Sequence, residues 1–431
     1  MLFRSKAFYA LALLGTSHNG RDVAIYMRAA AIVEQVYAKN PQHPGAAHYL
    51  IHAYDDPVHA PLGLRYADAY SKIAPSASHA LHMPSHIYVA MGLWDESAAI
   101  NERSVKAADA RREAKKLDVD QRGFHALLWL VYTYTQQGRY EDARGVLAQI
   151  DAAAKESGSE RTRSHLALAR AAWLIETRKW GEAKAPVDPK GLPKDAAISD
   201  LFAIGFAGVR SGNRAAASQA MAQMAALMED TPVNMAPVSS APATAPRPGI
   251  KPIAPGPRAV PGPGITPIKP EAPSQPAQGA MAAMGMPTAG GGDKRVPQVM
   301  AQQLEAMILF SEGRREEAVV LARQAAVVES SLPFEFGPPV PVKPVNEQVG
   351  EMLMDLRRPK EAMEAFELSL KRNPKRALSL LGLARAATLA KDPTTAQRAY
   401  SELRDIWKKA DKTLPELKEI GALAPPKPSS R

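Results

Sequence analysis

The sequence predicts an all-α protein: a solenoid of stacked antiparallel helix pairs, interrupted by a proline-rich disordered linker. One spacing of turn, bulky and small residues recurs along most of the 431 residues, as expected of repeated helix–turn–helix units. Alanine dominates a composition that is 46% hydrophobic but only 6% aromatic, which favours helices that approach one another closely. The spacing is lost in a segment rich in proline and glycine.

Each repeat begins with a turn residue, followed two positions later by a bulky residue and five positions later by a small one. The small residue lets two helices approach, and the bulky residue closes the pair. A single pair cannot bury its apolar stripe, so neighbouring pairs must stack. We expect about nine units, with turns at Asp55, Gly92, Gly138, Arg178, Gly212, Gly313, Arg357 and Lys391.

The first element is predicted to be a helix that ends at Gly15. Arg4 and Lys6 precede its apolar run, a pattern that signal peptides share, but a helix fits the repeat better. No apolar run approaches the roughly 20 residues that a membrane-spanning helix needs, so we expect no membrane span.

Residues 230–297 are too rich in proline to form a helix, and we interpret them as a solvated linker. An SH3-type ligand is the alternative for this segment. The linker separates an N-terminal block, residues 1–229, from a C-terminal block, residues 298–431. The shorter proline-rich run at 334–344 contains aromatic residues and predicts an ordered strap against the solenoid, followed by a helix that begins near Asn346.

Composition excludes several chemistries. The chain has no cysteine, so disulfides, thiolate catalysis and cysteine-based metal sites are absent. The net charge is +10, and residues 103–122 form its densest basic run; we interpret that run as a solvated helix face, because no nucleic-acid reading motif accompanies it. No nucleophile elbow, phosphate loop or His-Glu-x-x-His pair occurs. We therefore expect a binding protein rather than an enzyme.

Histidines are the informative feature, since eight of the ten lie between His43 and His125. Concentrated imidazoles can form a metal site, a proton-active site or a polar ligand groove. A buried histidine can also simply bond a backbone carbonyl or a turn, and His43 and His59 fit that structural role. The pairs whose spacing of three or four places them on one helix face are His48/His52, His79/His82 and His82/His86.

The repeat resembles the tetratricopeptide repeat family over nearly the whole chain outside the linker. The motifs HPGAAHYLIHAYD at 43–55 and HALHMPSHI at 79–87 are further similar to a bacterial subgroup whose role is undefined. Longer members of that subgroup carry further units and often an export signal before the point where this chain starts. We therefore expect a truncated start or a misassigned start codon: the chain as written is cytoplasmic, and a longer one would be periplasmic or exported.

The resemblance implies that the first helices of successive units line a concave groove, in which the second, fifth, ninth and twelfth slots of each unit face a ligand. Counted from the turns, these slots hold the histidines, with His79, His125 and His165 in the second. His48 departs from the pattern, because its eighth slot usually holds a small residue. The ligand-binding groove is therefore expected to be lined by Tyr49, His52, His79, His82, His86, His125 and Tyr132.

Two functions follow from this groove. The first is an interaction scaffold that binds a protein or peptide partner there. The second is a metal-binding protein or a metal-dependent, hydrolase-like enzyme, in which a divalent transition metal such as zinc is the cofactor. Asp55 and Asp56 offer nearby carboxylates, and a pH-responsive groove is a third reading. The expected metal ligands are His48, His52, His82 and His86.

Overall fold

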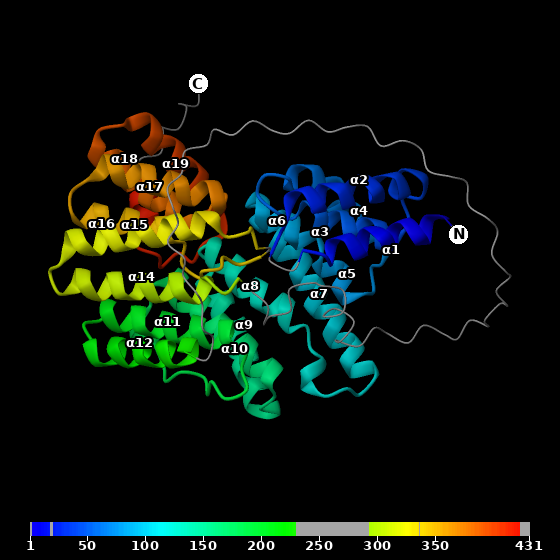
Figure 1. Cartoon of the computed structure of the whole chain (residues 1–431), viewed down its shortest axis with the longest axis horizontal. Coiled ribbons are helices and arrows are strands. Elements are labelled where there is room, and N and C mark those ends of the chain that lie inside the picture. Colours follow the sequence, from blue (N-terminus) through cyan, green and yellow to red (C-terminus); the bar gives the residue numbers. More distant parts are fainter. Residues whose placement is uncertain (1, 18–19, 230–292, 336, 423–431) are drawn as a thin grey trace, which may run out of the picture.

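The computed structural model describes four stretches of the chain, residues 2–17, 20–229, 293–335 and 337–422. These stretches contain α-helices, short 3-10 helices and no strand, so the predicted all-α class is confirmed (Figure 1). The predicted linker lies outside the described residues except for its last five positions. No helix within the four stretches is both long and apolar enough to cross a membrane.

Helices follow one another as packed pairs (Figure 1). Before the linker they are α1 (Leu2–Leu14), α2 (Val23–Lys39), α3 (Pro44–Tyr54), α4 (Ala60–Ile73), α5 (Ser78–His82), α6 (Pro84–Met91), α7 (Trp94–Ala114), η1 (Val119–Gln121), α8 (Phe124–Gln136), α9 (Tyr140–Ser157), α10 (Glu160–Thr177), η2 (Trp180–Glu182), α11 (Lys194–Arg210) and α12 (Arg214–Glu229). After the linker they are α14 (Val296–Ser311), α15 (Arg315–Ser331), α16 (Val345–Asp355), α17 (Pro359–Arg372), α18 (Ala377–Ala390), α19 (Pro393–Ile406), η3 (Trp407–Lys409) and α20 (Glu416–Ala422).

The predicted turns set the register of the pairs. A left-handed residue with positive φ ends a helix and sharply reverses the chain. Among the predicted turn residues Asp55 is the exception, because its φ is −80°. The small residues expected five positions after the turns are buried, as Ala143 and Ala362 illustrate, except for Ala183 after Arg178, which is exposed. The turn residues with positive φ are Gly92, Gly138, Arg178, Gly212, Gly313, Arg357 and Lys391.

Buried apolar side chains form two large cores. The first runs from Ala10 to Ile100, within α1–α7. The second runs from Val89 to Ile420 and joins helices on both sides of the linker, because α11 and α14 pack directly on each other. In Figure 1 the blue helices accordingly lie apart from the green, yellow and orange ones. The two cores meet near α6 and α7. The domain boundaries expected at residues 229 and 298 stay a prediction.

The stack from α8 onward closes on itself. The backbone N–H of Ala377, at the start of α18, donates to the side-chain oxygen of Gln136 at the end of α8 (2.9 Å). The indole N–H of Trp407 donates to the carbonyl of Gln136, also at 2.9 Å. The indole N–H of Trp94, in α7, donates to the carbonyl of Lys375 (3.1 Å). The last helix pair therefore returns to α8, and the helices between them form a ring.

Charged side chains hold the inside of this ring together. Arg376 is fully buried; its Nη1 lies 2.7 Å from Oε1 of Glu176, and its Nε lies 2.7 Å from Oε2 of Glu347. Lys343 is also buried and reaches the other oxygen of Glu347 at 2.9 Å. Ser379 donates to Glu347 as well. Such groups are tolerated in an interior only because each charge has a close partner.

Candidate functional site

Three segments bring histidines together beside the ring. Helix α3 carries His52, and α8 carries His125. Between them the chain forms two short helices, α5 and α6, because Pro84 cannot donate a backbone hydrogen bond and so interrupts the ladder. The break at Pro84 leaves His82 at the end of α5 and His86 in the first turn of α6, which places both imidazoles against α3 and α8.

Asp55 is the hub of the first half of the cluster. Its Oδ2 accepts from Nδ1 of His52 (3.2 Å) and from Nδ1 of His86 (2.9 Å). The guanidinium of Arg21 bonds the other oxygen of Asp55 and also reaches Asp56 at 3.2 Å. Arg21 further donates to the carbonyl of His52, so one arginine closes the end of α3 and fixes both carboxylates.

His82 anchors the second half. Its Nδ1 lies 2.6 Å from Oδ1 of Asn101, whose own amide donates to the carbonyl of Ser97 and so is held in that orientation. The other ring nitrogen of His82, Nε2, is buried and has no hydrogen-bond partner within the four described stretches. The indole of Trp129 lies against this pair: it stacks on His86 and meets His82 edge-on, each at 4.7 Å between ring centroids.

The imidazoles form a continuous file across the face of α3, α5, α6 and α8. His79 and His48 approach through their Nε2 atoms (3.3 Å), and His48 and His52 approach likewise (3.2 Å). The file continues through Asp55, His86 and His82 to His125. His79 and His125, at its two ends, are exposed, whereas the histidines between them are buried or half-buried.

Burial keeps the inner imidazoles neutral at neutral pH. Loss of solvation lowers the pKa of His48 and of His82 to about 3. Burial, reinforced by the neighbouring imidazoles, also holds the pKa of His52 and His86 well below the ordinary 6.5. A neutral imidazole offers one lone pair, so it can bind a metal ion or accept a hydrogen bond.

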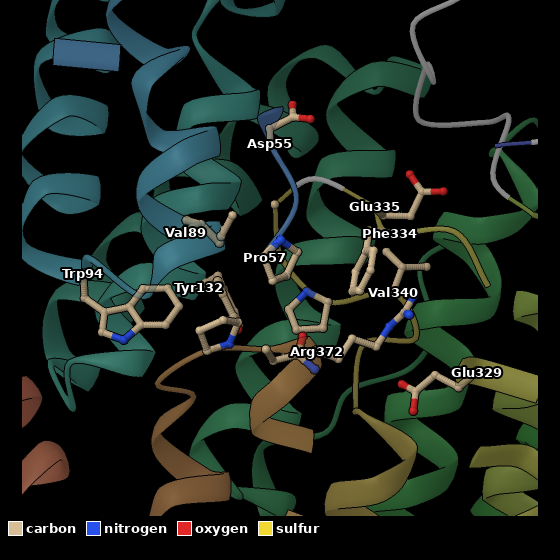
Figure 2. Close-up of a pocket in the computed structure, with 15 residues that line it drawn as sticks. Asp55, Pro57, Val89, Trp94, Tyr132, Glu329, Phe334, Glu335, Val340 and Arg372 are labelled. Atoms are coloured by element: carbon tan, nitrogen blue, oxygen red, sulfur yellow. The ribbon is translucent and has the colours of Figure 1, made fainter. Parts of the chain in front are cut away.

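The four expected metal ligands stay a prediction, and the structure places them differently. His48 contacts His52 and His79 but belongs to neither of the groups of closely spaced ligand atoms, which are His52 with Asp55 and His86, and His82 with His86 and His125. Of the expected groove residues, Tyr49 is half-buried beside His48. Tyr132 is buried, its hydroxyl lies 3.5 Å from Nη1 of Arg376, and it lines a pocket that Asp55 also lines (Figure 2).

Two predicted structural histidines have that role in the structure. Nδ1 of His43 accepts from the backbone N–H of Ala46 and caps α3. His59 pairs with Asp56 at 2.8 Å. His165 was placed by the repeat in a ligand-facing slot, but its Nδ1 bonds the carbonyl of Arg161, one turn back in α10 (2.7 Å).

Sequence reasoning missed the partners of the cluster. Asn101 lies in α7, Arg21 lies in a loop, and Trp129 lies in α8, one turn after His125. The one available signal was at Asn101, which is a polar amide nine positions after a turn, where the helix pairs bury a side chain. The charged residues inside the ring, such as Arg376, carried no periodic signal at all.

A strap, residues 332–344, crosses between the ring and this face; Phe336 within it is outside the described residues. Phe334, Glu335 and Val340 of the strap line a pocket together with Asp55 and other residues (Figure 2). The pocket has a volume of about 40 Å³, so it can hold a few water molecules but no folded partner. The predicted ordered strap is thus present along its described residues, and α16 begins at Val345.

The strap rests on Trp129 through a glycine. Gly337 has a φ of +100°, and a Cβ there would lie 2.4 Å from the indole of Trp129. Two arginine contacts fix the strap nearby: Arg372 donates to the carbonyl of Pro333 (2.9 Å), and its guanidinium lies over the ring of Phe334. Only a residue without a side chain allows the backbone to approach the indole this closely.

Replacing Gly337 by alanine is expected to lift the strap from Trp129 and to destabilise the chain by about 1–3 kcal/mol. Thermal unfolding measures the loss, and limited proteolysis within 332–344 reports the lifted strap. Gly158→Ala is the matched control, because Gly158 also has a positive φ (+61°) but an added Cβ would meet nothing within 4 Å. Equal effects of the two substitutions would mean that the strap does not depend on the indole contact.

Comparisons with known proteins agree with the helical-repeat architecture. The tetratricopeptide repeat family model matches residues 344–376, the stretch that holds α16 and α17. The chain therefore contains a tetratricopeptide repeat, as the resemblance predicted. None of the curated proteins matches the sequence of this chain.

Solved structures similar to this chain include a human IFIT1 dimer with m7Gppp-AAAA, at 12% sequence identity, covering 95% of this chain and 72% of that chain, with a TM-score of 0.40. Yeast Tom70 is similar at 10% identity, covering 93% of this chain and 88% of that chain, with a TM-score of 0.34. The P58(IPK) TPR domain is similar at 13% identity, with 98% of each chain covered and a TM-score of 0.24. TM-scores this low transfer no ligand or partner to this chain.

Proposed function

We propose that this tetratricopeptide-repeat chain is an interaction scaffold that binds an extended segment of a protein partner at the histidine-lined face of α3, α5, α6 and α8. The supporting observation is that a proline-rich, non-helical segment of the chain itself, the strap, already lies beside Asp55 and Trp129 at this face. Proline-rich segments suit such binding, because their preformed extended shape loses little conformational entropy.

The strap also indicates what a partner segment would need. Its aromatic residue, Phe334, lies under the guanidinium of Arg372. Its acidic residue, Glu335, is half-buried. Loss of solvation raises the pKa of its carboxyl to about 6, and the charges of Arg21 and Arg372 oppose that rise. Its glycine, Gly337, permits close approach to an indole. An aromatic residue, an acid and then a glycine followed by prolines is therefore the expected chemistry of a ligand.

A strap-replacement experiment tests the proposal. In the full-length chain, residues 332–344 are replaced by a glycine–serine run of equal length, and the same stretch is added as a labelled synthetic peptide. We expect saturable one-to-one binding in fluorescence anisotropy, because the peptide refills the vacated face. The unaltered chain is expected to bind the peptide much more weakly, since its own strap competes at high effective concentration.

A peptide that carries Gly337→Ala is the matched control, since it keeps the charge and the length of the strap but cannot approach Trp129. If the two peptides bind the strap-replaced chain equally, or if neither binds, the histidine-lined face is not a peptide-binding face. Circular dichroism of the strap-replaced chain shows that the helices have formed before either peptide is added.

A further inference from the structure

We propose that His82, His86 and His125 bind one divalent transition metal ion. Each residue offers a ligand nitrogen, and these atoms all lie within 4.8 Å of one another. In a tetrahedral zinc site with bonds of about 2.0–2.1 Å, ligand atoms lie roughly 3.3 Å apart. Small side-chain rotations of the three imidazoles therefore suffice to close around an ion.

The hydrogen bonds of His82 point to a ligand at its other nitrogen. The amide nitrogen of Asn101 donates to the carbonyl of Ser97, so it is the amide oxygen, which can only accept, that faces Nδ1 of His82. Nδ1 of His82 must then carry the proton, which leaves a lone pair on Nε2. That atom is buried and has no hydrogen-bond partner among the described residues, and a buried polar atom without a partner is unfavourable unless a ligand satisfies it.

His86 is oriented in a matching way. Its Nδ1 bonds the carboxylate of Asp55, which is itself fixed by Arg21. Metal-binding histidines almost always donate one ring N–H to a carboxylate or a carbonyl oxygen while the other nitrogen binds the ion. Asp55 and Asn101 thus stand where the hydrogen-bond partners of two metal ligands are expected.

His125 leaves the coordination open on the solvent side. It is the exposed member of the three, whereas His82 and His86 are buried. A water molecule or a group from a bound molecule can complete the fourth position there. Because all three ligands are imidazoles, zinc, copper and nickel are preferred over magnesium or calcium.

The competing group, His52 with Asp55 and His86, is less suited to an ion. Oδ2 of Asp55 already accepts from both imidazoles, and its other oxygen is paired with Arg21. An ion at this place would lie beside the guanidinium and would have to displace these hydrogen bonds. In the three-histidine group the same contact serves instead to orient His86, because Asp55 bonds its Nδ1.

Zinc and cobalt titrations of the chelator-treated full-length chain test the assignment. We expect one Zn²⁺ per chain by isothermal titration calorimetry, and visible absorption of four-coordinate Co²⁺ that Zn²⁺ abolishes. Loss of even a hydrogen-bond partner of a ligand typically weakens metal binding about 10–100-fold. His125→Ala is therefore expected to raise the Kd for Zn²⁺ at least tenfold; this exposed side chain can be removed without opening the core.

His79→Ala is the matched control, because His79 is an equally exposed member of the same file but lies outside the three-histidine group. It is expected to leave the Kd for Zn²⁺ within about twofold of the parent. The assignment is overturned if the parent chain shows no saturable zinc binding, or if His79→Ala weakens binding as much as His125→Ala does. Neither readout depends on whether the chain binds a peptide.

Discussion

Replacing Arg376 by methionine is expected to destabilise the ring by about 3–5 kcal/mol, the usual effect of removing one partner from a buried ion pair. Burial opposes the charge of Arg376, but the attraction of Glu176 and Glu347 outweighs it and holds its pKa well above the ordinary value. Without the guanidinium, two buried carboxylates would face each other and Lys343 alone. Urea unfolding of the full-length chain, followed by circular dichroism, measures the loss.

The control for this prediction is an arginine of the same block at the surface. Arg323 pairs with Glu361 at 2.7 Å, but half of its side chain is exposed. Exposed pairs contribute roughly 0–1 kcal/mol, so Arg323→Met is expected to have little effect. Should Arg376→Met behave like Arg323→Met, the buried charges would not be what closes the ring.

The location of the change is also predicted. Because Arg376 joins the start of α18 to Glu176 in α10, its loss is expected to open the contact between α18 and the end of α8. Hydrogen exchange should therefore quicken first near Gln136 and Ala377. The N-terminal helices have a separate core and should keep their protection.

Acidification from pH 7 to pH 5 is expected to loosen α3, α5 and α6 before the ring. Burial lowers the pKa of His82 from 6.5 to about 3, so between these values the unfolded chain binds a proton that the native chain does not. The stabilisation is therefore complete above about pH 6.5 and is lost as the pH falls. At pH 5 one such group accounts for about 2 kcal/mol. His48, His52 and His86 act in the same direction.

A buried carboxyl in the other block has the opposite dependence. Burial raises the pKa of Glu329, whose carboxylate accepts the N–H of Val345 at the start of α16, to about 7. The native chain then binds the additional proton between about pH 4.5 and 7, so this contribution to stability increases as the pH falls. Lowering the pH should therefore destabilise α3, α5 and α6 while the contribution of Glu329 stabilises the start of α16.

Hydrogen exchange by mass spectrometry at both pH values, corrected for the intrinsic rates, measures the opening free energies. His82→Gln is the matched variant, since glutamine is neutral and cannot titrate. It should remove about 2 kcal/mol of the difference between pH 7 and pH 5 in α5 and α6. Exchange in these helices that is independent of pH in the parent chain would contradict the prediction.

Much of the fold could be predicted because its signals are local. About a dozen consecutive residues specify a left-handed turn and the small residue that follows it at a fixed distance. Arg357 and Lys391 adopt the left-handed conformation although neither is glycine. The same repeat spacing explains why His52, His82 and His86 converge, since helices of adjacent pairs face one another. The chemical environment of these histidines was less predictable. Whether His48 or His125 approaches His82 depends on how α8 packs, and the repeat spacing does not determine that.

The sequence by itself determined the class of this protein, its helix pairs, its turns and the helices that carry the imidazoles, because each depends on residues a few positions apart. Only the tertiary structure decided that the stack closes into a ring, that Tyr132 contacts Arg376 and that the strap reaches Trp129. The physical reason is distance along the chain: Arg376 and Glu176 are 200 residues apart, and their attraction becomes strong only when closure removes both from water. A repeat spacing of a few residues cannot indicate an ion pair between positions so far apart.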